Sequence, residues 1–292
     1  MKRSPESPGG SRAASAVLIL VLVCSFSYRL HAQSLDQSLD QSYRFMYNLQ
    51  FDAALKTVEE AKAIAPEDPL PWMAQACAIL FREFERLHIL NSEIFTSDDK
   101  FAARKAQNWN PASKRQFESA LAGAETLAQR RLARDKNDVH ALFAMTIVNG
   151  LRADDAALIE KKNLTALGFT KSANGYAERL LARAPDYYDA YVATGLGKYL
   201  IGGKAAQVRW VLRLGGIKGD QEEGLKELTL AANRGHYLAP FAKILLAFDD
   251  LRHKNKPEAR KKLIWLSQQF PNNPHFHEEM AKLDSRRAGA GP

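Results

Sequence analysis

The sequence predicts an all-α protein built from helical hairpins, and three observations lead to this fold class. Ala, Leu, Lys, Arg and Glu, which favour helices, dominate long runs of the chain. No alternating run of Val, Ile, Thr or Tyr persists, as a half-buried strand would require. An amphipathic segment, 51–64, ends at a proline, and the same arrangement recurs later. The 292 residues, 46% apolar and 25% charged, suffice for a sizeable core or a repeat array.

Residues 1–32 have the pattern of a secretory signal peptide. Basic residues precede the apolar run 17–24, which is too short to span a bilayer core of about 30 Å. We expect cleavage after Ala32, so that the mature domain 33–292 is exported, in the periplasm or secreted by a bacterium. An uncleaved N-terminal membrane anchor is one alternative. A lipoprotein attached through Cys24 is another, although the preceding Val23 is larger than such cut sites prefer.

The mature chain is less basic than the full sequence. The full chain has 41 basic and 33 acidic residues, a net charge of +8; removing four basic and one acidic residue leaves 37 and 32, a net of +5. This mild charge and the predicted export argue against nucleic-acid binding. Cys77 is the only cysteine left, so an intrachain disulfide is impossible. Its apolar helical surroundings predict a buried thiol rather than a nucleophile.

The helix predicted over 51–64 has one apolar face, because its apolar residues recur mostly at steps of three and four. Pro66 ends this helix, since proline lacks the backbone donor and clashes with the preceding turn. Ala259 precedes Pro271 by twelve residues, as Ala54 precedes Pro66. A large residue follows the closing prolines by six positions, at Trp72, Tyr191 and His277.

This pattern resembles the tetratricopeptide repeat, a helix-turn-helix unit of about 34 residues in which a large and then a small residue mark the first helix. The small residue lets two helices approach closely. The units that match best are about 35–68 and 240–273, and partial units begin near Pro69, Val139 and Tyr188. The resemblance implies a right-handed α-solenoid over most of the mature chain.

The closing prolines are not spaced by multiples of 34 residues, so the predicted array is interrupted. We expect insertions at about 89–110 and 151–174. The segment 274–283 is similar to the capping helix that ends such arrays, and residues 284–292 are expected to form a disordered tail. A weaker resemblance lies in the glycine-rich segment 216–225. It looks like a signature of the eukaryotic tetratricopeptide family linked to inclusion-body clearance and the mitochondrial outer membrane, although its glycines also suit a simple capped turn.

Motifs for catalysis, cofactors or metals are weak, so we predict a protein that is not an enzyme and needs no cofactor or metal. The segment 197–205 departs from a phosphate-binding loop, because Lys198 stands at a glycine position and Ala205 replaces the hydroxyl. His275 and His277 are two residues apart and face different sides of a helix. The remaining alternative is an enzyme whose site is assembled from distant residues, such as His140 or His236 with buried carboxylates.

The tetratricopeptide resemblance implies that the first helix of each unit lines a concave groove. An apolar and aromatic set would face inward and suit an amphipathic helix, a hydrophobic peptide or an acyl chain. The alternative is that the insertions fill this surface and that these residues are ordinary core. The predicted groove residues are Tyr43, Met46, Tyr47, Met73, Leu80, Phe143, Ile147, Val192, Leu196, Tyr199, Ile244 and Phe248.

A second candidate surface is basic. No acidic residue lies between Asp189 and Asp220, and a basic amphipathic helix with Trp210 suits an anionic membrane or an acidic partner. An ordinary repeat helix with a solvated outer face is the alternative. The basic residues are Lys198, Lys204, Arg209, Arg213 and Lys218.

The sequence therefore predicts an exported, non-catalytic scaffold that binds a protein or peptide partner in the cell envelope. The principal alternative is an envelope-surface adaptor that contacts anionic lipid or polymer through the basic segment. The sequence does not name the partner.

Overall fold

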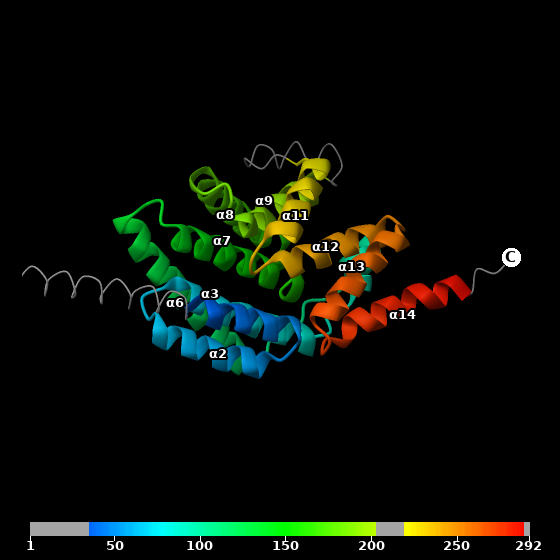
Figure 1. Cartoon of the computed structure of the whole chain (residues 1–292), viewed down its shortest axis with the longest axis horizontal. Coiled ribbons are helices and arrows are strands. Elements are labelled where there is room, and N and C mark those ends of the chain that lie inside the picture. Colours follow the sequence, from blue (N-terminus) through cyan, green and yellow to red (C-terminus); the bar gives the residue numbers. More distant parts are fainter. Residues whose placement is uncertain (1–34, 203–218, 289–292) are drawn as a thin grey trace, which may run out of the picture.

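The computed structural model describes residues 35–202 and 219–288, and within these ranges the chain folds into helices joined by short turns, with no strand. Figure 1 shows the helices stacked side by side as successive hairpins. The prediction of an all-α array of helix-turn-helix units is confirmed. In the described part of the chain, no helix is both long enough and apolar enough to cross a membrane.

Five hairpins and a last single helix make up the described array. Helices that follow one another in the chain pack together, and the helix at 35–47 is tied to its partner where Ser42 Oγ donates to the Ala54 carbonyl at 3.2 Å. The hairpins are 35–47 with α2 (Phe51–Ile64), α3 (Pro69–Arg86) with α6 (Pro111–Arg134), α7 (Val139–Asp154) with α8 (Asn163–Arg183), α9 (Tyr191–Gly202) with α11 (Gln221–Arg234), and α12 (Ala239–Arg252) with α13 (Lys256–Gln269), followed by α14 (Pro274–Ala288).

Local sequence sets where several of these helices begin. The Asp68 carboxylate accepts from Leu70 N at 2.9 Å and caps α3, and Pro69 takes the first helical position, where no backbone donor is needed. Asp138 caps α7 in the same way, accepting from Ala141 N at 2.8 Å. Helices α3 and α7 therefore begin at Pro69 and Val139, and the short η2 turn (Tyr188–Ala190) leads into α9, as the repeat pattern indicated.

The chain between α3 and α6 contains two short helices, α4 (Ser92–Thr96) and α5 (Asp98–Ala103), within the stretch expected as an insertion at 89–110. Its end is fastened to the turn after α7. Gln107 N donates to the Ile159 carbonyl at 2.9 Å, and Trp109 Nε1 donates to Asp155 Oδ1 at 2.7 Å. This insertion is therefore part of the packed structure.

Two expected boundaries are wrong. The irregular stretch expected at 151–174 shrinks to a π-helical turn (Asp155–Ile159) and a few linking residues, because buried side chains keep α7 and α8 regular on either side. The tail expected at 284–292 is helical as far as Ala288. Arg260 Nη2 lies 3.3 Å from Asp284 Oδ2 and fastens this added turn to α13.

The first hairpin contacts the last one, which closes the array on itself. Tyr47 donates its hydroxyl to the Tyr237 carbonyl at 2.9 Å, and its own carbonyl accepts from Asn273 Nδ2 at 3.0 Å. Asn48 Oδ1 accepts from Asn272 N at 3.1 Å. In an open solenoid each unit contacts only its neighbours. Here the end of α3 and the start of α14 also lie close together (Figure 1), with His275 Nε2 2.7 Å from Glu85 Oε2.

Replacing Tyr47 with Phe tests this closure. The Tyr237 carbonyl loses its donor while the ring contact with Phe270 stays, so we expect a loss of about 1 kcal/mol in the free energy of unfolding. Hydrogen exchange should quicken in α13 and α14. Tyr187→Phe is the control, because that ring packs on Phe143 and no hydrogen bond is described for its hydroxyl. Equal losses in the two variants would contradict the role given to Tyr47.

Candidate functional site

The residues expected to line a concave groove pack against the chain itself. Six of them are at most 7% exposed, and the other six are half-buried. The buried six are Tyr43, Met46, Met73, Leu80, Phe143 and Val192. The half-buried six are Tyr47, Ile147, Leu196, Tyr199, Ile244 and Phe248. The first six therefore belong to the core, whereas the second six keep part of their surface exposed, so ligand binding along this surface stays a prediction.

Aromatic contacts explain why this inner surface is filled. Tyr43 of the first helix stacks on Tyr237 with ring centroids 4.9 Å apart, across the array. Phe143 lies 4.9 Å from Tyr187 in the same cluster. At the other end, Phe95 of the insertion helix α4 stacks on Phe248 of α12 at 5.3 Å. The closure and the insertion together cover these aromatic side chains with other parts of the chain.

The basic segment is described only at its first residue. Lys198 Nζ lies 2.5 Å from Glu227 Oε1, so its charge is used between α9 and α11. The other four residues, Lys204, Arg209, Arg213 and Lys218, lie outside the described residues. Membrane or polymer binding through this segment stays a prediction.

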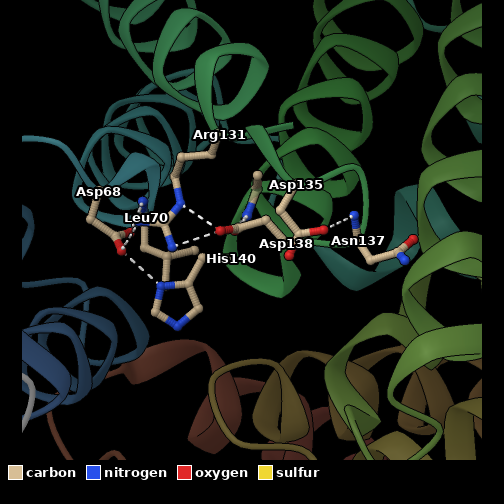
Figure 2. A network of polar contacts seen from close by, with 8 residues as sticks. Asp68, Leu70, Arg131, Asp135, Asn137, Asp138 and His140 are labelled. Carbon is tan, nitrogen blue, oxygen red and sulfur yellow. Dashed lines mark hydrogen bonds and ion pairs between the residues drawn. The ribbon is translucent and has the colours of Figure 1, made fainter. Parts of the chain in front are cut away.

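A polar network joins the starts of α3 and α7 to the end of α6 (Figure 2). Arg131 Nη1 lies 3.2 Å from Asp68 Oδ2, and Arg131 Nη2 lies 2.9 Å from Asp138 Oδ2. His140 Nδ1 lies 2.7 Å from the same Asp68 oxygen that Arg131 contacts. Because Asp68 and Asp138 also cap α3 and α7, this network fixes three helix ends relative to one another.

The pKa of His140 is raised and the pKa of its partner Asp68 is lowered. Burial lowers the pKa of His140, but its hydrogen bond with Asp68 and the charge of that carboxylate outweigh burial, so the net shift is upward. Burial raises the pKa of Asp68, but hydrogen bonds from His140 and Leu70 N and nearby positive charge outweigh burial, so the net shift is downward. The pair is therefore an ion pair over a wider pH range than either isolated group would allow.

This pair predicts a pH window for stability. The pKa of His140 is higher in the folded protein than the unfolded value near 6.5, so its ion pair contributes its full stabilisation below that value. This contribution is lost as the pH rises through the pKa of the folded protein. A lowered aspartate pKa stabilises the fold above the unfolded value near 3.8. We expect His140→Gln to lose stability near pH 5.5, by less than about 1 kcal/mol because the imidazole is partly exposed, and to lose little at pH 9. Denaturant midpoints at the two pH values measure this; equal losses would contradict it.

The histidines and the cysteine bear on the enzyme alternative. His236 Nε2 lies 2.7 Å from Asp40 Oδ1, in a contact separate from the His140 network. Cys77 is buried, burial raises its thiol pKa to about 12, and the Tyr43 hydroxyl lies 3.9 Å from its sulfur. A thiol of this kind stays protonated and unreactive at neutral pH. Over the described residues, no group of three or more His, Cys, Asp and Glu side chains could hold a metal ion.

Surface hollows lie over α6. Two hollows, of about 410 Å³ and about 200 Å³, share Leu127, and we call them together the outer groove. Neither His140 nor His236 lines either hollow. The larger hollow is lined by Pro66, Trp72, Ser119, Ala122, Gly123, Thr126 and Leu127. The smaller is lined by Glu67, Leu127, Arg130, Arg131, Arg134, Asp135 and Asp138.

Trp72 forms a fixed wall of the larger hollow. A Cβ built on Gly123 would lie 2.4 Å from Trp72 Cε3, so only glycine leaves room for the indole at this point of α6. Lys62 Nζ lies over the ring at 3.8 Å and is itself held by Gln75 Oε1 at 2.7 Å. The ring is thus clamped between two helices before any ligand arrives.

Comparison with known proteins does not identify a family for this chain. No known family model matches the chain, and no curated protein sequence matches it. Among solved structures, the chain is similar to the crystal structure of a thermophilic TPR protein from Thermus thermophilus, with 15% identity and a TM-score of 0.43, over 85% of this chain and 98% of that one. This likeness is too low to add to the argument, so the fold class rests on the helix pairs themselves.

Proposed function

We propose that this chain is an exported, non-catalytic tetratricopeptide-type scaffold that binds a protein or peptide partner in the bacterial cell envelope. The proposal that it is a divergent member of that family rests on the repeat pattern and on the stacked hairpins. Export rests on the signal pattern of residues 1–32. The stacked helical hairpins support partner binding, because arrays of this kind serve as interaction scaffolds. The inner surface is packed with the chain's own aromatic residues, so binding is expected elsewhere on the array, and the hollows over α6 are one such place.

Crosslinking in intact cells, followed by purification and mass spectrometry, tests partner binding. We expect one or a few envelope proteins to be recovered reproducibly, with crosslinks that map to α6 or the turn before α3. Recovery of no partner above an untagged control would overturn the scaffold proposal. Cell fractionation and N-terminal sequencing test export, and we expect the mature protein to begin at Gln33 in the periplasm or medium. A full-length chain in the cytoplasm would overturn that part.

A further inference from the structure

We propose that the contact between the first and last hairpins is a pH-sensitive closure, which tightens when His236 and His275 gain protons. The closure acts on the shape of the array and is independent of the proposed function. Each of the two ion pairs described across this contact contains a histidine. His236 Nε2 lies 2.7 Å from Asp40 Oδ1, and His275 Nε2 lies 2.7 Å from Glu85 Oε2. A lysine or arginine in these places would keep its charge through neutral pH, whereas a histidine does not.

His275 lies between two carboxylates on different helices. Its Nε2 faces Glu85 near the end of α3, and its Nδ1 lies 3.4 Å from Glu278 Oε2 on α14 itself. An ionised carboxylate only accepts hydrogen bonds, and a neutral imidazole carries one proton. Neutral His275 can therefore donate to one of the two carboxylates, whereas its protonated form donates to both. Protonation adds a donor and a positive charge where two negative charges meet.

His236 has acidic surroundings of the same kind. Asp40 on the helix at 35–47 faces its ring from across the contact, with Asp36 one turn earlier on that helix. On its own side, the backbone N of His236 donates to Asp189 Oδ1 at 2.8 Å. Burial raises the pKa of Asp189, and the charge of His236 is among the effects that lower it. The ring also stacks on Tyr237 at 4.2 Å, so the imidazole lies directly on the aromatic contact that joins the two ends of the array.

Basic residues on the elements around the two histidines have other partners. The exposed Arg44 on the helix at 35–47 has no described ion pair. The other contacts are Arg86 with Glu83 at 2.5 Å on α3, Lys282 with Glu279 at 2.7 Å on α14, and Arg234 at the end of α11 over the Tyr188 ring at 4.9 Å. A protonated histidine therefore meets carboxylates at both places.

The remaining polar contacts across the closure keep their charge state over the range in which histidine titrates. Asn48 and Asn272 are neutral, and burial raises the pKa of Tyr47 well above its ordinary value, so its hydroxyl keeps the proton that it donates to the Tyr237 carbonyl. Histidine changes charge between about pH 8 and pH 5. The closure should therefore strengthen as the pH falls through this range. Below about pH 4.5 the carboxylates lose charge as well, and the effect should reverse.

Hydrogen exchange at Asn272 N measures opening of the closure, because this amide donates to Asn48 Oδ1 across the contact. Its protection factor, the intrinsic exchange rate divided by the observed rate, is measured by NMR on the purified protein at pH 5.5 and pH 8.0. We expect about three- to tenfold higher protection at pH 5.5, since each partly exposed ion pair shifts an equilibrium by up to about fivefold. Leu142 N, which bonds to the Asp138 carbonyl at the start of α7, is the reference for changes in overall stability. Equal protection of Asn272 at the two pH values, or a change no larger than that at Leu142, would overturn the proposal.

Two double variants assign the effect to these ion pairs. His236→Gln/His275→Gln removes both titrating groups, and Asp40→Asn/Glu85→Gln removes both acidic partners while the histidines stay. Each should reduce the ratio of Asn272 protection between the two pH values to less than about twofold.

The matched control is His277→Gln, because His277 is an exposed histidine two residues from His275 on α14 and has no described ion pair. It should leave the protection ratio of Asn272 unchanged. A ratio that persists in either double variant, or that His277→Gln abolishes, would show that the pH dependence arises elsewhere and would overturn the closure as proposed.

Discussion

Replacing Asp189 with Ala should lower the free energy of unfolding by about 3–5 kcal/mol. Asp189 is 3% exposed, and its two carboxylate oxygens accept from three consecutive backbone donors: His236 N at 2.8 Å, Tyr237 N at 3.1 Å and Leu238 N at 3.0 Å. These donors precede α12, where the helix itself offers no acceptor. Each buried donor left without a partner costs about 1–3 kcal/mol.

Two variants show whether the carboxylate itself matters. Asp189→Asn keeps one acceptor oxygen but turns an amide donor toward a backbone donor, so we expect an intermediate loss of about 1–2 kcal/mol. The control is Asp186→Ala, an exposed residue three positions earlier, which should change stability by less than about 0.5 kcal/mol. Urea midpoints measure all three. Faster amide exchange at 236–238 should accompany Asp189→Ala, and a loss no larger than that of Asp186→Ala would refute the capping role.

The start of several units was predictable because local chemistry determines it. Asp68 followed by Pro69 is a capping residue followed by the one residue that needs no donor, and both signals lie within two positions of each other. Asp138 before Val139 is similar. Asp189 carried no comparable signal, because the donors that it accepts from lie in the next unit, more than forty residues later.

Whether the inner surface is open or packed could not be predicted from local sequence in the same way. The tetratricopeptide resemblance implies an open groove only where the ends of the array stay apart. Here Tyr43 meets Tyr237 and Phe95 meets Phe248, and each pair joins segments far apart in the sequence. Apolar periodicity shows that such residues are buried but does not show what buries them.

The outer groove was missed for a related reason. Trp72 was named from the sequence as the large residue that follows Pro66, whereas Gly123 was not singled out. Their contact depends on how α6 packs after the insertion, which no short pattern encodes. The glycine-rich segment 216–225 has a packing explanation at its described end. A Cβ on Gly219 would lie 2.6 Å from Gly202 N, and one on Gly224 would lie 2.6 Å from Tyr199 N.

That packing predicts the effect of Gly224→Ala, which should destabilise the fold by up to about 2 kcal/mol after the gain in helix propensity is counted. The added methyl group would lie 2.6 Å from the Gly195 carbonyl oxygen as well as from Tyr199 N. Both are backbone atoms of α9, so the clash can be relieved only by moving α11 away from α9 along their contact. Overpacking of this kind costs about 1–3 kcal/mol and exceeds the gain in helix propensity from glycine to alanine, which is about 1 kcal/mol.

Gly175→Ala is the matched control. Gly175 lies within α8, and a Cβ there would meet nothing within 4 Å, so only the propensity gain of up to about 1 kcal/mol should remain. Thermal unfolding should separate the two variants by roughly 2–12 °C in a domain of this size, since they differ by the overpacking cost of about 1–3 kcal/mol. Equal midpoints would show that α9 and α11 are not in backbone contact.

A double variant tests the shared cause of these effects. The contact is reciprocal, because a Cβ on Gly195 would lie 2.9 Å from the Gly224 carbonyl oxygen. A single separation of α9 and α11 accommodates both methyl groups, so Gly195→Ala/Gly224→Ala should lose less stability than the sum of the single variants. Strict additivity would mean that each glycine acts through its own surroundings. Denaturant unfolding measures the stability loss of the double variant and of each single variant. The amount by which the double loss falls below the sum of the single losses therefore shows how much of the effect arises at one shared helix crossing.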